Sequence, residues 1–210
     1  MAKKEIKEIS LTDFIDFVNK SGNAKLTKVR SVKYRPQYES FSDYYKPIRE
    51  GIVKAHKADC DKGSLDEIIT KTKDPKKLSN YRAIITGYKK FWGTKNLSWI
   101  APPFEKWTEG DLTIRINPEV ALEQKSKDGK STFYVIKFYF KEDTITKYQV
   151  DQILTLMEYK LRKKVKEPEV IFALLDTRKG KLHIKRNNEL KELPLLKGEF
   201  VSFATMWDMI

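Results

Sequence analysis

The chain has 210 residues, of which 40% are hydrophobic and 34% charged, and its formal net charge is +13. This length and apolar content suffice for one substantial core and exclude a disordered chain. No apolar run approaches the ~18 residues of a membrane-spanning helix, and the lysine-rich N-terminus lacks the apolar segment of a secretory signal. A single cysteine, Cys60, excludes an internal disulfide framework and predicts a reducing, cytoplasmic location.

The positive charge is an excess of 42 basic over 29 acidic side chains. Such an excess attracts polyanions, of which nucleic acid is the commonest. A lysine-rich composition also arises in proteins that have no such partner. Charge alone therefore leaves nucleic-acid binding open.

The first part of the chain, up to residue 95, is predicted to be helical. Residues 11–20 have the spacing of a short amphipathic helix, with Ser10 and Asp13 as a capping box and Gly22 placed to end it. Residues 25–34 fit either a strand or a helix.

Three further helices are expected over residues 41–57, 64–72 and 75–92. The regular part of the first should start near Pro47, which suits a first turn. Ser64 and Glu67 resemble a capping box for the second. The third has a start signal at Asp74-Pro75, and Gly93 closes it.

Helical spacing of the apolar residues ends near Asn96, and strand-like segments follow. Residues 112–124 and 132–140 flank Asp128-Gly129, which is a hairpin signal. Pro118 interrupts the first segment, so this segment is an edge strand, carries a bulge, or consists of two successive strands.

The clearest helix in the chain is predicted over residues 143–165. A continuous apolar run at 169–176 is typical of a buried strand, and a turn leads from it into 181–186. The apolar C-terminal tail should pack on the body or on a second copy. We therefore expect an α+β or mixed α/β protein: a helical N-terminal lobe (1–95) on a small mixed sheet (96–210) with one long crossing helix, as two lobes or one compact domain.

Lys137 stands in the middle of the apolar segment 132–140. Alternation places it on one face with Val135 and Tyr139, and burying an unpaired ammonium is costly or forces loss of its proton. Either Lys137 pairs with Glu119 or Glu123 across the hairpin, or it opens into a functional cleft, or its head reaches water while its stem lies on the sheet.

The order of these segments resembles the core of the restriction-endonuclease-like, or PD-(D/E)xK, nucleases. "NPEVAL" (117–122) stands where that family has Pro-Asp, and "VIK" (135–137) stands where it has acid-x-Lys. The resemblance implies an endonuclease-like core, with Glu119 as the first Mg²⁺ ligand and Lys137 near the attacking water and the scissile phosphate. The sequence departs from the family at the second acid, where Val135 stands.

Two interpretations of the resemblance remain open. One is a Mg²⁺-dependent nuclease with Glu119, Glu123 and Lys137 as catalytic residues, whose missing ligand comes from Glu123, Asp111 or Glu158. The other is a degenerate relative that binds DNA or RNA without cutting. A third hypothesis, of a different class, is a non-catalytic interaction or regulatory factor whose apolar C-terminus recruits a protein partner or a second copy.

Two basic clusters, at 160–166 and 178–186, lie on the predicted helix end and on the hairpin that follows it. If they converge on one face, they suit contacts with phosphates, which position a nucleic-acid backbone without reading its sequence. The alternative is a solvated helix end and an ordinary exposed turn. The residues concerned are Lys160, Arg162, Lys163, Lys164, Arg178, Lys179, Lys181, Lys185 and Arg186.

Other candidate sites have weaker support. His56 and Cys60 are four residues apart and would form half of a metal site, but zinc needs four ligands and His183 is the only other histidine. The aromatic residues between 81 and 107 suit either base stacking or core packing, and packing is favoured. The sequence has no hydrolase triad motif and no glycine-rich phosphate loop.

Overall fold

The structure, a computed structural model, describes residues 7–35, 43–167, 169–185 and 190–210. Its α-helices are α1 (Leu11–Val18), α2 (Asn23–Lys33), α3 (Lys46–Lys57), α4 (Asp66–Lys71), α5 (Pro75–Trp92), α6 (Lys147–Leu161) and α7 (Leu193–Asp208), and the 3₁₀ turns are η1 (Lys62–Leu65) and η2 (Arg162–Lys164). Its strands are β1 (Lys7–Ser10), β2 (Asn96–Ile100), β3 (Glu105–Glu109), β4 (Leu112–Ile116), β5 (Val120–Lys125), β6 (Ser131–Tyr139), β7 (Val170–Asp176) and β8 (Lys181–Ile184). The protein is therefore mixed α/β, as expected. None of the described helices is long and apolar enough to cross a membrane.

The strands form two sheets. The larger has the order β2-β5-β6-β7-β8, in which β6 and β7 are parallel and the other neighbours antiparallel. Because parallel neighbours need a crossover connection, α6 runs between β6 and β7. The smaller sheet has the order β1-β4-β3, with β1 parallel to β4. Pro118 lies where the chain passes from β4 to β5, so the segment around it consists of two successive strands in different sheets.

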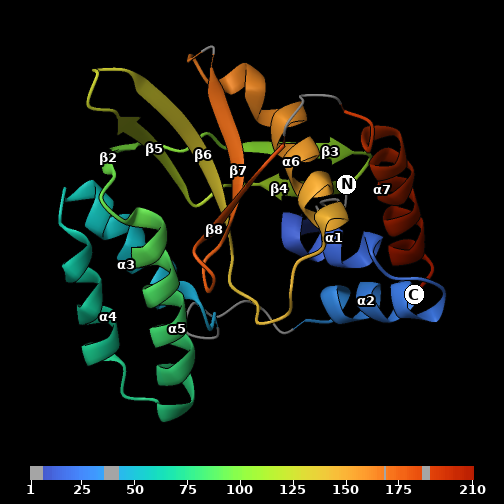
Figure 1. Cartoon of the computed structure of the whole chain (residues 1–210). Helices are drawn as coiled ribbons and strands as arrows, with labels where there is room; N and C mark the ends of the chain where they lie inside the picture. The colour runs from blue at the N-terminus through green and yellow to red at the C-terminus, as the bar shows by residue number, and fades with distance from the viewer. Residues whose placement is uncertain (1–6, 36–42, 168, 186–189) are drawn as a thin grey trace, which may run out of the picture.

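Helices cover both faces of the larger sheet, with α3, α4 and α5 on one side and α1, α6 and α7 on the other (Figure 1). Alternate residues of β6 accordingly enter two cores. Val135 belongs to a core with α1, α6 and α7, the α6-side core. Ile136 and Phe138 belong to a core with α3 and α5, the α5-side core. Burial on both faces explains why the segment 132–140 is apolar almost throughout.

The first 95 residues do not form one helical lobe. Ile9, Phe14 and Val29, from β1, α1 and α2, are buried in the α6-side core. Ile52 and Tyr88, from α3 and α5, are buried in the α5-side core. The first 95 residues therefore contribute to two cores on opposite faces of one sheet.

Several predicted helix ends are confirmed. The Ser10 hydroxyl accepts a hydrogen bond from the backbone N–H of Asp13 at 3.0 Å and caps α1. Asp74 caps α5 in the same way, and Gly93 ends that helix at a positive φ of 56°. These ends are encoded locally, because each cap satisfies backbone groups of its own first or last turn.

Two other predicted ends are wrong. Helix α1 ends at its C-cap Asn19, and Gly22 instead precedes α2, which contains all of the ambiguous segment 25–34 except its last residue, the C-cap Tyr34. Ser64 does not cap α4. It lies in the preceding turn η1 and donates to the carbonyl of Asp61, the residue that caps η1.

The apolar C-terminal tail packs on the body of the same chain. Helix α7 buries Leu196, Phe200 and Phe203 in the α6-side core. The rings of Phe17 and Phe203 are 4.9 Å apart, centroid to centroid, in an edge-to-face arrangement. Most of the apolar surface of the C-terminal tail is therefore buried against the rest of the same chain.

Candidate functional site

Lys137 is paired with Glu119, as one of the alternatives from the sequence predicted. Its Nζ lies 2.6 Å from Glu119 Oε1 and donates a second hydrogen bond to the Asn117 carbonyl at 2.9 Å. The other carboxylate oxygen of Glu119 accepts from the backbone N–H of Phe138 at 2.7 Å. Both side chains are about nine-tenths buried. The ammonium therefore keeps its charge partner where water is largely excluded.

The local sequence explains how Glu119 reaches this position. Pro118 has no N–H to continue the β4 ladder, so the chain turns out of the smaller sheet there. The backbone N–H of Glu119 then donates to the Ile136 carbonyl at 3.0 Å and begins the pairing of β5 with β6. This register brings the Glu119 side chain beside Lys137 on the neighbouring strand.

The pair lies in a cleft of about 670 Å³. Its wall includes Ser10 at the end of β1, Tyr45 just before α3, Gln149 on α6 and Leu174 on β7. The cleft thus opens near the carboxyl ends of the parallel strands β6 and β7, where α/β sheets commonly bind ligands.

Further ion pairs surround the mouth of the cleft. Lys141 Nζ is 2.8 Å from both carboxylate oxygens of Asp16. Asp13 lies 2.8 Å from Lys28 and 2.9 Å from Arg35. Burial alone would raise the pKa of Asp13, but hydrogen bonds from Arg35, Lys28 and Ser10 and the charge of Lys28 hold this pKa below its ordinary value. Asp13 is therefore fixed as an anion.

The charges in the lining of the cleft are balanced. The acidic residues are Glu8, Asp13, Asp16, Asp43 and Glu119, and the basic residues are Arg35, Arg49, Arg115, Lys137 and Lys141. The cleft is therefore not a purely positive groove. A polyanion that binds there would have to displace acidic side chains from their basic partners.

The residues of the cleft do not fit a Mg²⁺ ion. Both oxygens of Glu119 are engaged by Lys137 and Phe138, and Val135 at the second acid position is buried in the α6-side core. Within the described ranges, no group of three or more His, Cys, Asp or Glu side chains is arranged to hold a metal. Since Mg²⁺ prefers octahedral coordination by several oxygens, one engaged carboxylate is a poor site.

The other acids considered from the sequence lie elsewhere. Glu123 is opposite Phe133 on β6, four residues or about 13 Å along the strand from Lys137. Its carboxylate accepts from the Ser131 hydroxyl at 2.5 Å. Asp111 pairs with Lys7, and Glu158 pairs with Arg162 one turn along α6. The structure therefore does not bring these acids to the pair.

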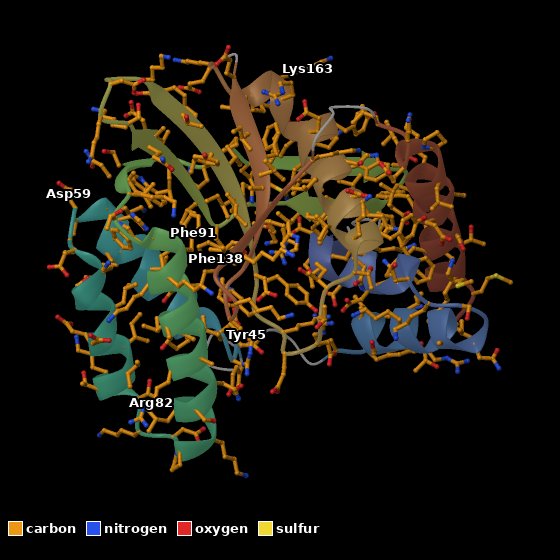
Figure 2. The ribbon with its side chains drawn as sticks, viewed as in Figure 1. Tyr45, Asp59, Arg82, Phe91, Phe138 and Lys163 are labelled. Atoms are coloured by element: carbon orange, nitrogen blue, oxygen red, sulfur yellow. The ribbon has the colours of Figure 1, made fainter. Side chains whose placement is uncertain are left out.

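The two basic clusters converge only in part, because Arg162 and Lys185 line one small cleft whereas the turn end of the second cluster lies elsewhere. Arg162 bonds the carbonyl of Val170, where β7 begins, whereas Lys179 bonds Thr144, which precedes α6. Lys179 is therefore separated from Arg162 by the length of α6, about 22 Å. Figure 2 likewise shows Lys163 far from Tyr45 and Phe138, which line the cleft.

Several of these cations have structural partners. Arg178 donates to Asn80 on α5 at 2.7 Å. Lys185 contacts Glu192 at 2.9 Å and Thr155 at 2.7 Å. Of the remainder, Lys164 pairs with Glu105 and Lys179 with Asp176. Lys163 and Lys181 are exposed, whereas Lys160 is half-buried with its ammonium 5.1 Å from the centre of the Tyr159 ring. Arg186 lies outside the described residues.

His56 and Cys60 do not come together as metal ligands. His56 is buried, stacks on Trp92 with 4.1 Å between ring centroids, and is 2.8 Å from the Tyr88 hydroxyl. Cys60 is exposed. The aromatic residues between 81 and 107 are mainly core residues, because Tyr81, Tyr88, Phe91, Trp92 and Trp107 are all buried.

Sequence reasoning missed most of the cleft mouth. Asp13 and Asp16 are three residues apart on α1, which places both on one face of the helix. This spacing could have indicated from the sequence that α1 carries two carboxylates on one face. The partner Lys141 is 125 positions away from Asp16, and no local pattern indicates this contact.

A scan against protein-family models finds no match for this chain. A search of the curated proteins finds none either.

Proposed function

We propose that this protein binds nucleic acid through the cleft around Glu119 and Lys137, as a degenerate relative of the endonuclease-like proteins. The observation that carries the proposal is the buried Glu119–Lys137 pair on adjoining strands at the edge of a cleft. The order of strands β2-β5-β6, helix α6 and strand β7 supports it, because it is the segment order of the family that the sequence resembles. The single cysteine supports a cytoplasmic location.

The proposal is of binding without Mg²⁺-dependent cleavage. The supporting evidence is the engaged state of Glu119 and the apolar Val135 at the second acid position. Among the described residues no second carboxylate contacts Lys137, which neutralises Glu119. The pair then fixes the shape of the cleft floor.

The phosphate contacts are assigned to the more exposed cations of the cleft. The side chains of Arg35, Arg115 and Lys141 are 49%, 46% and 41% exposed. Each is held by an acid on the protein, and each can exchange that partner for a phosphate oxygen. The overall charge of +13 adds attraction at long range.

The test compares two triple variants that remove the same charge. One replaces Arg35, Arg115 and Lys141 by Gln, and its matched control replaces Lys160, Lys163 and Lys164 by Gln. Fluorescence anisotropy with short single- and double-stranded DNA and RNA gives the Kd over a range of salt. We expect the cleft variant to weaken binding at least tenfold and to flatten the slope of log Kd against log salt by about two to three. The control should change the Kd only a few-fold.

Two results would contradict this proposal. Absence of binding to all four nucleic acids at low salt would leave the interaction factor as the explanation. Cleavage that requires Mg²⁺ or Mn²⁺ and is lost in Lys137→Met would show a nuclease with a relocated ligand.

The interaction factor has less structural support. Its expected surface was the apolar C-terminus, yet Leu196, Phe200 and Phe203 are buried in the body of the chain. Leu195, Val201 and Met209 remain exposed at 45%, 57% and 79%, and they are too few to form a large apolar patch.

A further inference from the structure

A second cleft, of about 610 Å³, lies among α3, α4 and the N-terminal half of α5. These helices stand on the face of the larger sheet opposite α6, with α4 outermost (Figure 1). Residues that line the Glu119–Lys137 cleft do not line this one. Its volume is within the roughly 300–1,000 Å³ of sites that bind small molecules.

The floor of this second cleft is aliphatic. Ala55 and Ala58, on or directly after α3, provide small surfaces, and the Ile68 side chain on α4 covers Gly51. Ile68 is so close that a Cβ on Gly51 would lie 2.4 Å from its Cδ1. Tyr81 is the aromatic residue in the lining, but it is only 1% exposed. Among the described residues, a flat aromatic ligand therefore has no ring face to stack on in this cleft, whereas a flexible aliphatic chain fits small aliphatic walls.

The rim of the cleft has an excess of positive charge. Four lysines, Lys54, Lys71, Lys73 and Lys77, line it together with two acids, Glu67 and Asp74.

Both acids already have partners. Glu67 pairs with Lys71 at 2.7 Å, and Asp74 accepts the backbone N–H of Lys76 as the cap of α5. Neither Lys54 nor Lys73 has an acid within 4 Å in the part of the chain that the structure describes. Two ammonium groups beside an aliphatic floor suit an anionic head on an apolar chain.

We propose that the α3–α4–α5 cleft binds a single-chain aliphatic anion, with its chain along Ala55, Ala58 and Ile68 and its head at Lys54 and Lys73. This activity is separate from nucleic-acid binding. The head is a carboxylate or a phosphate ester, because both offer oxygens to ammonium groups.

The single cysteine of the chain provides a direct reporter, since Cys60 is exposed and lines this cleft. The rate of its alkylation by iodoacetamide, an uncharged reagent, is measured with increasing decanoate below the concentration that forms micelles. We expect a saturable slowing of at least fivefold. Decanol has the chain without the charge and acetate has the charge without the chain, so both should have little effect. Decyl phosphate distinguishes the two head groups.

Variants test the assignment of each part. Lys54→Gln with Lys73→Gln should raise the apparent Kd for decanoate about tenfold and leave the alkylation rate without ligand nearly unchanged. Ala58→Phe should fill the cleft and abolish protection. Ala24→Phe, at another exposed alanine, on α2, is its control and should behave like the unmodified protein.

Calorimetry with decanoate separates the remaining outcomes. Heat of binding that disappears in Ala58→Phe supports the proposal. Binding without protection of Cys60, or binding unaffected by Ala58→Phe, places the ligand elsewhere and overturns it. Equal protection by decanol and decanoate overturns the anionic head. If decanoate gives no protection and no heat of binding, the site itself is overturned.

Discussion

At the scale of single residues, Lys137 shows how a charge is kept inside an apolar strand. Its ammonium has one carboxylate oxygen and one carbonyl as acceptors, and Glu119 has a backbone donor for its second oxygen. A buried ion pair stabilises little unless such additional hydrogen bonds offset its desolvation. The sequence predicted this pair as one of several alternatives, because Glu119 directly precedes β5 and Lys137 lies on β6, the two strands of one hairpin.

His56 is a second buried polar residue, and it should make stability depend on pH. Desolvation by burial lowers its pKa from 6.5 to about 4. Its Nδ1 also has no hydrogen-bond partner among the described residues, so a proton there would lack an acceptor. The folded protein therefore holds His56 neutral at pH values where the unfolded chain binds a proton.

The lowered pKa of His56 makes the folded protein less stable at acidic pH. Between pH 6.5 and about 4, the free energy of unfolding should fall as the pH falls, by about 3 kcal/mol in total from this residue. Urea denaturation at several pH values measures the loss. His56→Gln, which can still hydrogen-bond the Tyr88 hydroxyl, is the control and should lack this part of the loss. Equal losses in both proteins between pH 7 and 5 would contradict the assignment.

At the scale of secondary-structure elements, the packing of α5 on the turn between β7 and β8 depends on Gly87. A Cβ at this position would lie 2.1 Å from the Thr177 carbonyl oxygen and 2.4 Å from that of Arg178. Both contacts are with backbone, which cannot move aside as a flexible side chain can. We expect Gly87→Ala to lower the free energy of unfolding by about 2–3 kcal/mol, as measured in urea.

Gly198 provides the matched control, since it also lies inside a helix. A Cβ at Gly198 meets no atom within 4 Å. Gly198→Ala should therefore stabilise α7 by about 0.5–1 kcal/mol, because alanine has less backbone freedom to lose than glycine. If the two substitutions change stability alike, the close approach at Gly87 is not what holds α5 in place.

Local signals account for the elements that the sequence predicted. The caps Ser10 and Asp74 lie next to the helices that they start, and the hairpin turn at Asp128-Gly129 joins adjacent strands. The place of β1 in the smaller sheet was not predictable, because its partner β4 lies about a hundred residues away. For the same reason the contact of Lys141 with Asp16 at the cleft mouth was missed, whereas the Glu119–Lys137 pair was not.

At the scale of the whole molecule, the α6-side core and the α5-side core share β5, β6 and β7. Ala121, Val135 and Leu174 belong to the first core, and their neighbours Leu122, Ile136 and Leu175 belong to the second. Because both cores pack on the same three strands, unfolding of the strands in one core also exposes the side chains of the other core. The two cores should therefore unfold together rather than as two domains divided at residue 96.

Phe200→Ala tests this coupling. Phe200 is fully buried, packs on Trp107 with 4.5 Å between ring centroids, and belongs to the α6-side core alone. Removing its ring should cost about 3–5 kcal/mol. Under native conditions, the slowest-exchanging amides of α5, on the opposite face, should then lose hydrogen-exchange protection by a hundredfold or more, to the same extent as those of α6. Val201→Ala, at the exposed neighbour, should leave both helices nearly unchanged. Loss of protection in α6 and α7 with α5 unaffected would instead show two cores that unfold independently.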